Sequence, residues 1–276
     1  MIKKLLCLFD VVHLPRLLLR HRGLLWQMTC RNLEARYRGS VLGLVWSFAH
    51  PLLMLCVYTF VFSTVFKARW GEAVVEGDGS FAVVMFCGLF LHNLLSESVL
   101  SGCVCIAGSP NLVKKVIFPL EVLPTAQVLS VFVLGVPWIL LLFLGAWLVL
   151  GHIGWTMLLL PLVLLPFLLL ALGLAFFVSS LGVYVSDMKY AAGVFMQILM
   201  FATPIFYPMS IVPERFRWML SWNPLTLFVE QARNVFLYGR CPDWRLLGLA
   251  AVVALMVFQL GSFFFVRTKR GFADVL

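Results

Sequence analysis

The chain has 276 residues, of which 62% are hydrophobic and only 12% are charged, with a formal net charge of +9. Soluble domains carry roughly a quarter charged residues, so this composition excludes an ordinary water-soluble protein and indicates burial in lipid. The basic residues flank apolar runs, which is typical of membrane topology and argues against a nucleic-acid-binding protein.

The first 40 residues form a basic segment with eight Lys and Arg. Within residues 24–38, apolar residues recur near helical spacing, beside a tryptophan. This pattern predicts an amphipathic helix that lies on the membrane surface. A solvated basic tail is the alternative. The residues expected to anchor the helix are Trp26, Arg31, Arg36 and Arg38.

Apolar runs that are long enough to cross a bilayer follow this basic segment. Internal prolines are compatible with membrane helices, because neighbouring helices satisfy the carbonyl groups that they free. We therefore expect an all-α integral membrane protein with one domain over residues 1–276, a membrane region over 41–266 and a tail over 267–276. The six expected spans are 41–66, 81–107, 122–150, 157–185, 190–208 and 246–266.

The connections between the spans predict the orientation. If residues 1–40 lie inside, the inner segments carry 14 of the 21 Lys and Arg. The positive-inside rule favours this arrangement, which places both termini in the cytoplasm. Residues 209–245 form a long outer segment that alternates aromatic and charged residues. We interpret it as one or two short helices that dip into the outer interface and bend at Asn223-Pro224.

Polar residues gather on one face of the second span: His92, Asn93, Ser96, Glu97 and Ser101. An ionisable side chain at membrane depth normally faces protein or water. Glu97 is therefore a candidate for lining a polar pathway or for pairing with a basic group. A structural hydrogen-bond cluster between helices is the alternative.

Aromatic residues gather near the outer ends of the first and fifth spans. Aromatic faces stack against sugar rings, so they are candidates for lining a polysaccharide channel. Helix packing and an interfacial belt are the alternatives. The candidates are Tyr58, Phe62, Phe66, Phe201, Phe206 and Tyr207.

No soluble catalytic motif is present in the sequence. There is no P-loop for ATP, and the five histidines are scattered without metal-ligand spacing. We therefore expect no catalytic residues, no metal site and no cofactor in this chain. The inner loop over 109–119 combines Lys114 and Lys115 with apolar residues, a pattern that can dock in a groove on a partner or anchor at anionic head groups.

Several strings occur in order across nearly the whole chain. Together they resemble the ATP-binding-cassette (type 2) exporter permeases for polysaccharides and polyol phosphates, and most closely the permeases for O-antigen polysaccharide. The strings are ARYRGSVLGLVW at 35–46, YTFVF at 58–62, NLVKKVIFP at 111–119, DMKY at 187–190, TPIFYP at 203–208 and WNPL at 222–225.

The resemblance implies a homodimeric permease in the cell inner membrane, paired with two copies of a P-loop ATPase that binds ATP and Mg²⁺. The 24–38 helix would be the interface helix, and residues 209–239 would be re-entrant helices. Asn111, Lys114 and Lys115 would form the coupling element on the ATPase, with the turn at Asp187 as a second contact. The outer aromatics and Glu97 would line the path of a lipid-linked glycan.

Three other functions remain open from the sequence. The cargo could be teichoic acid or a capsular polysaccharide. A membrane-embedded transferase acting on lipid-linked sugars would need more buried carboxylates than this chain has. A secondary transporter would favour broken helices at the midplane and internal repeats.

Overall fold

All regular structure in the computed structural model is helical over the residues that it describes, which are 13–65, 80–114, 118–150 and 154–276. Five of the segments are long and apolar enough to cross a bilayer, since a span needs about 20 residues. These segments are Gly43–Phe62, Phe81–Cys105, Val122–Leu148, Trp155–Tyr184 and Trp244–Val275. The expectation of an all-helical, multi-pass membrane protein is confirmed.

The expected fifth span, over 190–208, is shorter than its hydropathy suggested. Its helix, α10 (Met188–Phe201), has 14 residues. At 1.5 Å per residue it reaches about 21 Å, less than the roughly 30 Å of the hydrocarbon core. The helix ends before Thr203-Pro204, because a residue that precedes proline is disfavoured in helical conformation. Residues 202–208 continue as turns.

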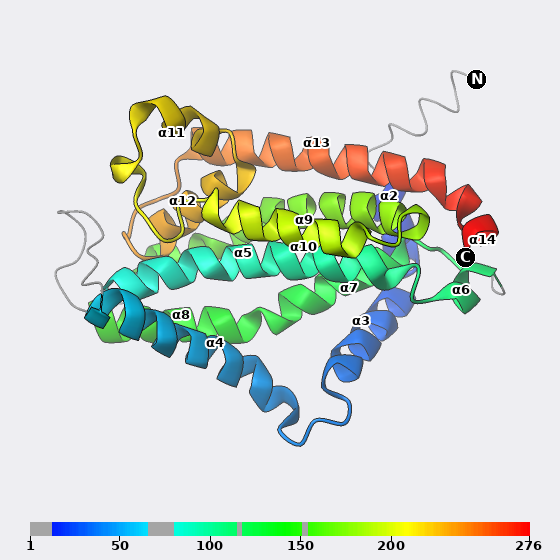
Figure 1. Cartoon of the computed structure of the whole chain (residues 1–276), viewed down its shortest axis with the longest axis horizontal. Coiled ribbons are helices and arrows are strands. Elements are labelled where there is room, and N and C mark those ends of the chain that lie inside the picture. Colours follow the sequence, from blue (N-terminus) through cyan, green and yellow to red (C-terminus); the bar gives the residue numbers. More distant parts are fainter. Residues whose placement is uncertain (1–12, 66–79, 115–117, 151–153) are drawn as a thin grey trace.

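Three long helices run side by side along the molecule: α5 (Ser80–Cys105), α9 (Leu160–Tyr184) and α13 (Trp244–Thr268) (Figure 1). The closest crossing joins α9 to α13. A Cβ atom at Gly261 would lie 2.0 Å from the carbonyl oxygen of Gly173. Only glycine at both positions allows the two backbones to touch, as is common in membrane helix pairs.

The first and third expected spans are interrupted by irregular turns. The third consists of α7 (Val122–Leu134) and α8 (Val136–Leu150), which part at Gly135, two residues before Pro137. The first consists of the short turn η1 (Gly43–Val45), α4 (Trp46–Tyr58) and the π-helical segment η2 (Thr59–Val65). A similar short turn, η3 (Trp155–Leu159), precedes α9.

The basic N-terminal region contains two helices, α2 (His13–Arg20) and α3 (Arg22–Tyr37). The helix that we expected over 24–38 is α3, but the sharper separation of apolar and basic faces lies in α2. Leu14 is buried in the core, whereas Arg16 and Arg20 are exposed. α3 packs against α7, and α2 lies near the end of the molecule that holds the C-terminus (Figure 1).

Short helices cover both ends of the bundle. At one end lie α6 (Pro110–Lys114), η5 (Lys269–Gly271) and α14 (Phe272–Val275). At the other lie η4 (Met209–Ile211), α11 (Glu214–Ser221) and α12 (Pro224–Phe236). The bend that we expected at Asn223-Pro224 separates α11 from α12. α11 exposes its aromatic residues, whereas most of α12 is buried.

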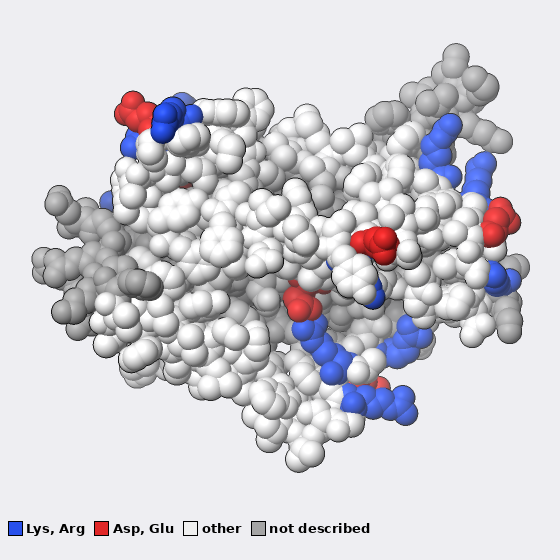
Figure 2. Space-filling model, in the orientation of Figure 1, with Lys and Arg blue, Asp and Glu red and all other residues white. Residues whose placement is uncertain are grey.

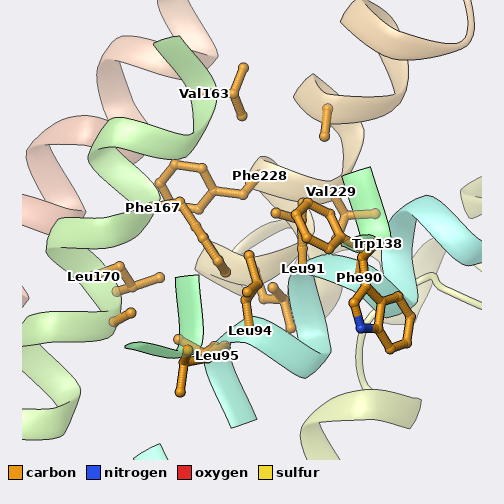
Figure 3. Packing of buried hydrophobic residues seen from close by; sticks show 14 of the residues in the cluster. Phe90, Leu91, Leu94, Leu95, Trp138, Val163, Phe167, Leu170, Phe228 and Val229 are labelled. Atoms are coloured by element: carbon orange, nitrogen blue, oxygen red, sulfur yellow. The ribbon is translucent and has the colours of Figure 1, made fainter. Parts of the chain in front are cut away.

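The core is built from aromatic and branched apolar side chains of α5, α8, α9 and α12 (Figure 3). The ring of Phe167 on α9 meets Phe228 on α12 edge-on, with 5.3 Å between centroids. The ring of Phe86 stacks on Trp138 of α8 at 4.9 Å. These contacts make α12 part of the bundle interior.

Charged side chains gather at the two ends of the molecule and along α3 (Figure 2). Between them, the visible face over α4 and α10 is a broad uncharged surface. An uncharged band between polar ends is the pattern that a bilayer imposes on a membrane protein. The long axis of Figure 1 therefore corresponds to the direction across the membrane.

The α9–α13 crossing predicts the effect of two alanine substitutions on one helix. Gly261→Ala places a methyl group against backbone, and overpacking of this kind costs about 1–3 kcal/mol. Gly248→Ala, also on α13, meets no atom within 4 Å. Thermal unfolding in detergent should give a lower melting temperature for Gly261→Ala and an unchanged or higher one for Gly248→Ala. Equal melting temperatures would contradict the crossing.

Candidate functional site

Four of the aromatic residues selected from the sequence come together at one end of the bundle. We call Tyr58, Phe62, Phe201 and Phe206 the aromatic cluster. Phe206 stacks on Phe62 and on Phe201, each with 5.8 Å between ring centroids. Tyr58 meets Phe206 edge-on at 6.3 Å, and Phe62 stacks on Phe81 of α5 at 5.6 Å. The cluster therefore joins the first span, α5 and the segment after α10.

The cluster combines a packed interior with an open edge. The side chain of Phe201 is 58% exposed, whereas Tyr58, Phe62 and Phe206 are partly buried against the core. Phe62 lies on the π-helical segment η2, a widened turn that often occurs at functional sites. A ring that is held on one side and open on the other can pack against the flat face of another ring.

Two further residues were selected with this group. The Tyr207 hydroxyl donates a hydrogen bond to the carbonyl oxygen of Phe201, with 2.8 Å between oxygens, which ties the turn back onto α10. Phe66 lies outside the described residues. Tyr207 therefore closes the turn that carries Phe206.

A buried guanidinium fixes the turn on its other side. Arg233 of α12 is only 4% exposed and donates to the carbonyl oxygens of Val84, Pro204 and Ile205, at N–O distances of 3.2, 2.8 and 3.2 Å. Arg233 therefore holds α12, α5 and the turn beside Phe206 together.

Asn223 makes the second link between α12 and this turn. Its side-chain oxygen caps α12 by accepting from the Leu225 amide at 3.0 Å. Its side-chain amide donates to the Thr203 hydroxyl at 2.9 Å and to the Ala202 carbonyl at 3.2 Å. The bend at Asn223-Pro224 is thereby fixed to the end of α10.

Glu97 does not share one polar cluster with the rest of its helical face. Its carboxylate forms an ion pair with Arg36 of α3, at 2.9 Å between nitrogen and oxygen. Both side chains are about two-fifths exposed, at 42% for Arg36 and 36% for Glu97. His92, on the same face, instead donates to the Met196 carbonyl of α10 at 2.9 Å. Of the alternatives for Glu97, pairing with a basic group is the one that the geometry shows.

The other residues selected on the N-terminal helix are exposed. Trp26 is 63% exposed, and Arg31 and Arg38 are also exposed. Arg38 follows the end of α3 and directly precedes the left-handed Gly39, where the chain turns toward α4. Arg36 is thus the one selected residue of this helix for which the structure gives an ion pair.

The residues selected for contact with a partner lie at the end of the molecule opposite the aromatic cluster (Figure 1). Asn111 and Lys114 are exposed on α6, and Asp187 is exposed in the turn between α9 and α10. Lys115 lies outside the described residues. The positions of Asn111, Lys114 and Asp187 leave them open to another protein.

The profile of the ABC-2 type transporter family matches residues 23–237, from the first turn of α3 to the end of α12. This chain belongs to the ABC-2 type transporter family. Members are the membrane permeases of exporters that work with an ATP-binding partner, and the permease itself is not an enzyme.

Individual relatives match this chain over nearly its whole length. The O-antigen export system permease protein RfbA of Myxococcus xanthus is 33% identical over 268 residues, which are 94% of this chain and 98% of the relative. A Klebsiella pneumoniae protein of the same name is 24% identical over 256 residues, with 92% and 95% covered. The family resemblance inferred from the sequence strings is confirmed.

Sequence reasoning missed three charged residues that organise this ABC-2 type transporter. Arg233 lies in the outer segment that we interpreted from its alternating aromatic and charged residues, and the residues one helical turn away include Val229, Phe236 and Leu237. A cation among apolar helical residues is a signal of a buried charge that needs partners. Glu121 and Lys269, which pair with each other, carried no comparable signal.

Arg233 provides a test of how the end of this ABC-2 type transporter that carries the aromatic cluster is held together. Arg233→Met keeps the apolar bulk but leaves three carbonyl groups without their donor, and each buried unsatisfied group costs about 1–3 kcal/mol. We expect a clear fall in melting temperature in detergent, together with faster hydrogen exchange over 202–208. The exposed Arg240→Met should change neither. A normal melting temperature and exchange rate in Arg233→Met would contradict this role.

Proposed function

We propose that this chain is the membrane subunit of an ATP-driven exporter that moves lipid-linked polysaccharide, of O-antigen type, out of the cytoplasm. The observation that carries the proposal is the match of nearly the whole chain to permeases named for O-antigen export. Two copies of the chain pair with two ATPase subunits in the cell inner membrane. ATP and Mg²⁺ bind to the ATPase, and this chain supplies no cofactor site.

The topology supports an orientation with both termini in the cytoplasm. α2, α6, the α9–α10 turn and α14 lie at one end of the molecule, together with much of its positive charge (Figures 1 and 2). The positive-inside rule makes that end cytoplasmic. α10 with residues 202–208 is then the fifth of six crossings in chain order, and α11 with α12 is a re-entrant pair that enters from the outer side.

The aromatic cluster would form the outer part of the glycan path. Sugar rings have flat C–H faces that pack on aromatic rings, and the exposed ring of Phe201 offers such a face at the rim of the bundle. Phe206 stacks on Phe201, and Tyr58 and Phe62 support Phe206 from the first span. If two copies of the chain bring these rings toward each other, they would form a channel. Its aromatic walls would stack on sugar rings whatever the sugar sequence of the glycan.

The cytoplasmic side would hold the entry and the coupling elements. α3 would be the interface helix, and its Arg36–Glu97 ion pair ties it to α5 where a lipid-linked glycan enters from the bilayer. Asn111 and Lys114 on α6 and Asp187 in the α9–α10 turn would contact the ATPase. No covalent chemistry occurs in the permease. Transport requires only that the nucleotide state changes the access or the affinity of the path for the glycan.

A deletion in the native host tests the function against a transferase. Loss of an exporter subunit should leave completed lipid-linked polymer on the cytoplasmic face and remove it from the cell surface. Loss of a transferase would prevent completion of the polymer. The readouts are surface labelling of intact cells and glycolipid extraction from inverted membrane vesicles. Affinity purification of the tagged chain should recover a P-loop ATPase.

The control for this experiment is an ATPase subunit with a substituted P-loop lysine. It should give the same internal accumulation as the deletion, because both remove transport and leave synthesis intact. The exporter assignment would be refuted if the deletion strain contained no completed polymer inside the cell while the ATPase-variant control strain did.

Phe201 tests whether the aromatic cluster acts through ring stacking. Phe201→Leu keeps an apolar side chain but removes the exposed ring face, whereas Phe201→Tyr keeps the face. Base–aromatic stacking in other systems amounts to about 1–3 kcal/mol per base, and we expect a comparable loss for sugar stacking, seen as a several-fold lower export rate in Phe201→Leu and near-normal export in Phe201→Tyr. Phe195→Leu, an exposed residue on α10, is the matched control. Normal export in Phe201→Leu would contradict sugar stacking and leave helix packing as the role of the cluster.

A further inference from the structure

The last nine residues of the chain contact both cytoplasmic connections of the membrane region. Residues 268–276, which we call the C-terminal junction, follow directly from α13. α13 has 25 residues, so it extends about 37 Å and is longer than the roughly 30 Å hydrocarbon core. Its end can therefore leave the bilayer, and the junction lies beside α6 (Figure 1).

The first contact is an ion pair with the connection that carries α6. The Lys269 ammonium pairs with the Glu121 carboxylate, which is only 1% exposed. Glu121 stands immediately before α7, seven residues after the end of α6. A carboxylate that is removed from water needs a partner, so the start of α7 is held to the junction by charge as well as by packing.

The second contact ties the junction to the end of α9. The Tyr184 hydroxyl, on the last residue of α9, donates to the Thr268 carbonyl at 2.9 Å. Gly271 makes room for this hydroxyl, because a Cβ atom there would lie 2.7 Å from the Tyr184 oxygen. Tyr184 stands three residues before Asp187, so this contact reaches the α9–α10 turn.

Phe272 anchors the junction in the core between these contacts. Its side chain is fully buried, and its ring meets Tyr184 edge-on at 5.9 Å and Phe265 at 5.6 Å. α14, which begins at Phe272, contacts both α6 and α9. The junction is therefore a single packed unit with contacts to two connections that are far apart in the sequence.

We propose that the C-terminal junction is a positioning element that makes α6 and the α9–α10 turn move together as one rigid unit. Lys269, Gly271 and Phe272 are its positioning residues, and none of them needs to touch the ATPase. The inference rests on the proposed function, in which α6 and the Asp187 turn receive the motion of the ATPase. Without the junction, each ATPase contact would move its own connection independently, and ATP hydrolysis would be less tightly linked to export.

The test uses the assembled permease–ATPase complex in liposomes loaded with lipid-linked polymer. Lys269→Met removes the ion pair, and Lys269→Arg keeps it. The adjacent and exposed Arg270→Met is the matched control. Allosteric coupling between sites typically amounts to about 5- to 150-fold, so we expect export per ATP hydrolysed to fall at least about fivefold in Lys269→Met. Lys269→Arg and Arg270→Met should keep the ratio of the unaltered complex.

A second variant and a second readout guard against simple loss of folding. Gly271→Ala displaces the Tyr184 hydroxyl without changing any charge, and it should also lower export per ATP. Hydrogen exchange of the complex should become faster in both 110–114 and 185–188 in Lys269→Met and Gly271→Ala. The proposal would be overturned if export and ATP hydrolysis fell in proportion, so that export per ATP stayed unchanged. Faster hydrogen exchange that is confined to residues 268–276 would overturn it as well.

Lys114→Glu on α6 separates this proposal from the proposed function. Export per ATP that is normal in Lys114→Glu would count against α6 as the ATPase contact, and so against the proposed coupling. The proposal for the junction itself is tested by hydrogen exchange in Lys269→Met. Faster exchange in both connections supports it, and unchanged exchange in either connection overturns it, whatever Lys114→Glu shows.

Discussion

Polar groups that leave water must find their partners within the chain, and in this protein those partners lie on distant segments. Lipid offers no hydrogen bonds, so an unpaired charge or carbonyl at depth is costly. Two contacts satisfy this constraint for buried charges, Arg233 with three carbonyl groups and Lys269 with Glu121. The more exposed Arg36–Glu97 pair adds a link between α3 and α5. The apolar surfaces place the helices in the membrane, whereas these contacts determine which segments are neighbours.

The aromatic cluster depends on the buried guanidinium of Arg233. α10 ends at Phe201, so nothing in its own helix determines where Phe206 lies. Arg233 binds the carbonyl groups of Pro204 and Ile205, directly before Phe206, and Tyr207 binds back to Phe201 directly after it. The ring of Phe206 is thus held from both sides by backbone contacts. A proposed sugar-stacking surface on an irregular segment gains its rigidity from α12, which is itself buried in the core.

Apolar runs predicted most of the membrane region, because the thickness of lipid sets a minimum length that hydropathy detects directly. Hydropathy did not detect where helices stop. Residues 190–208 contain no charged side chain, yet Thr203-Pro204 ends α10 early, and Gly135 divides the third span. The aromatic candidates could be selected from the sequence because their residue type alone suggests stacking. Their clustering could not be predicted, because it depends on the turn over residues 202–208, which the spacing of the residues does not indicate. The partners of Glu97, Arg233 and Glu121 are 28 to 149 positions away in the sequence, beyond the reach of any local pattern.

The α9–α13 pair connects the two ends of the molecule. The backbones touch at Gly173 and Gly261, and the rings of Phe176 and Phe265 meet at 5.2 Å, so the pair cannot shear without a clash. At the end that holds the C-terminus it carries Tyr184 and leads into Lys269 of the C-terminal junction. At the opposite end α13 begins at Trp244, directly after Asp243, whose backbone amide donates to the Gln231 side chain of α12 at 2.8 Å. Because close-packed interiors transmit strain, a displacement of the proposed junction would reach α12, and from there through Arg233 the turn that holds Phe206.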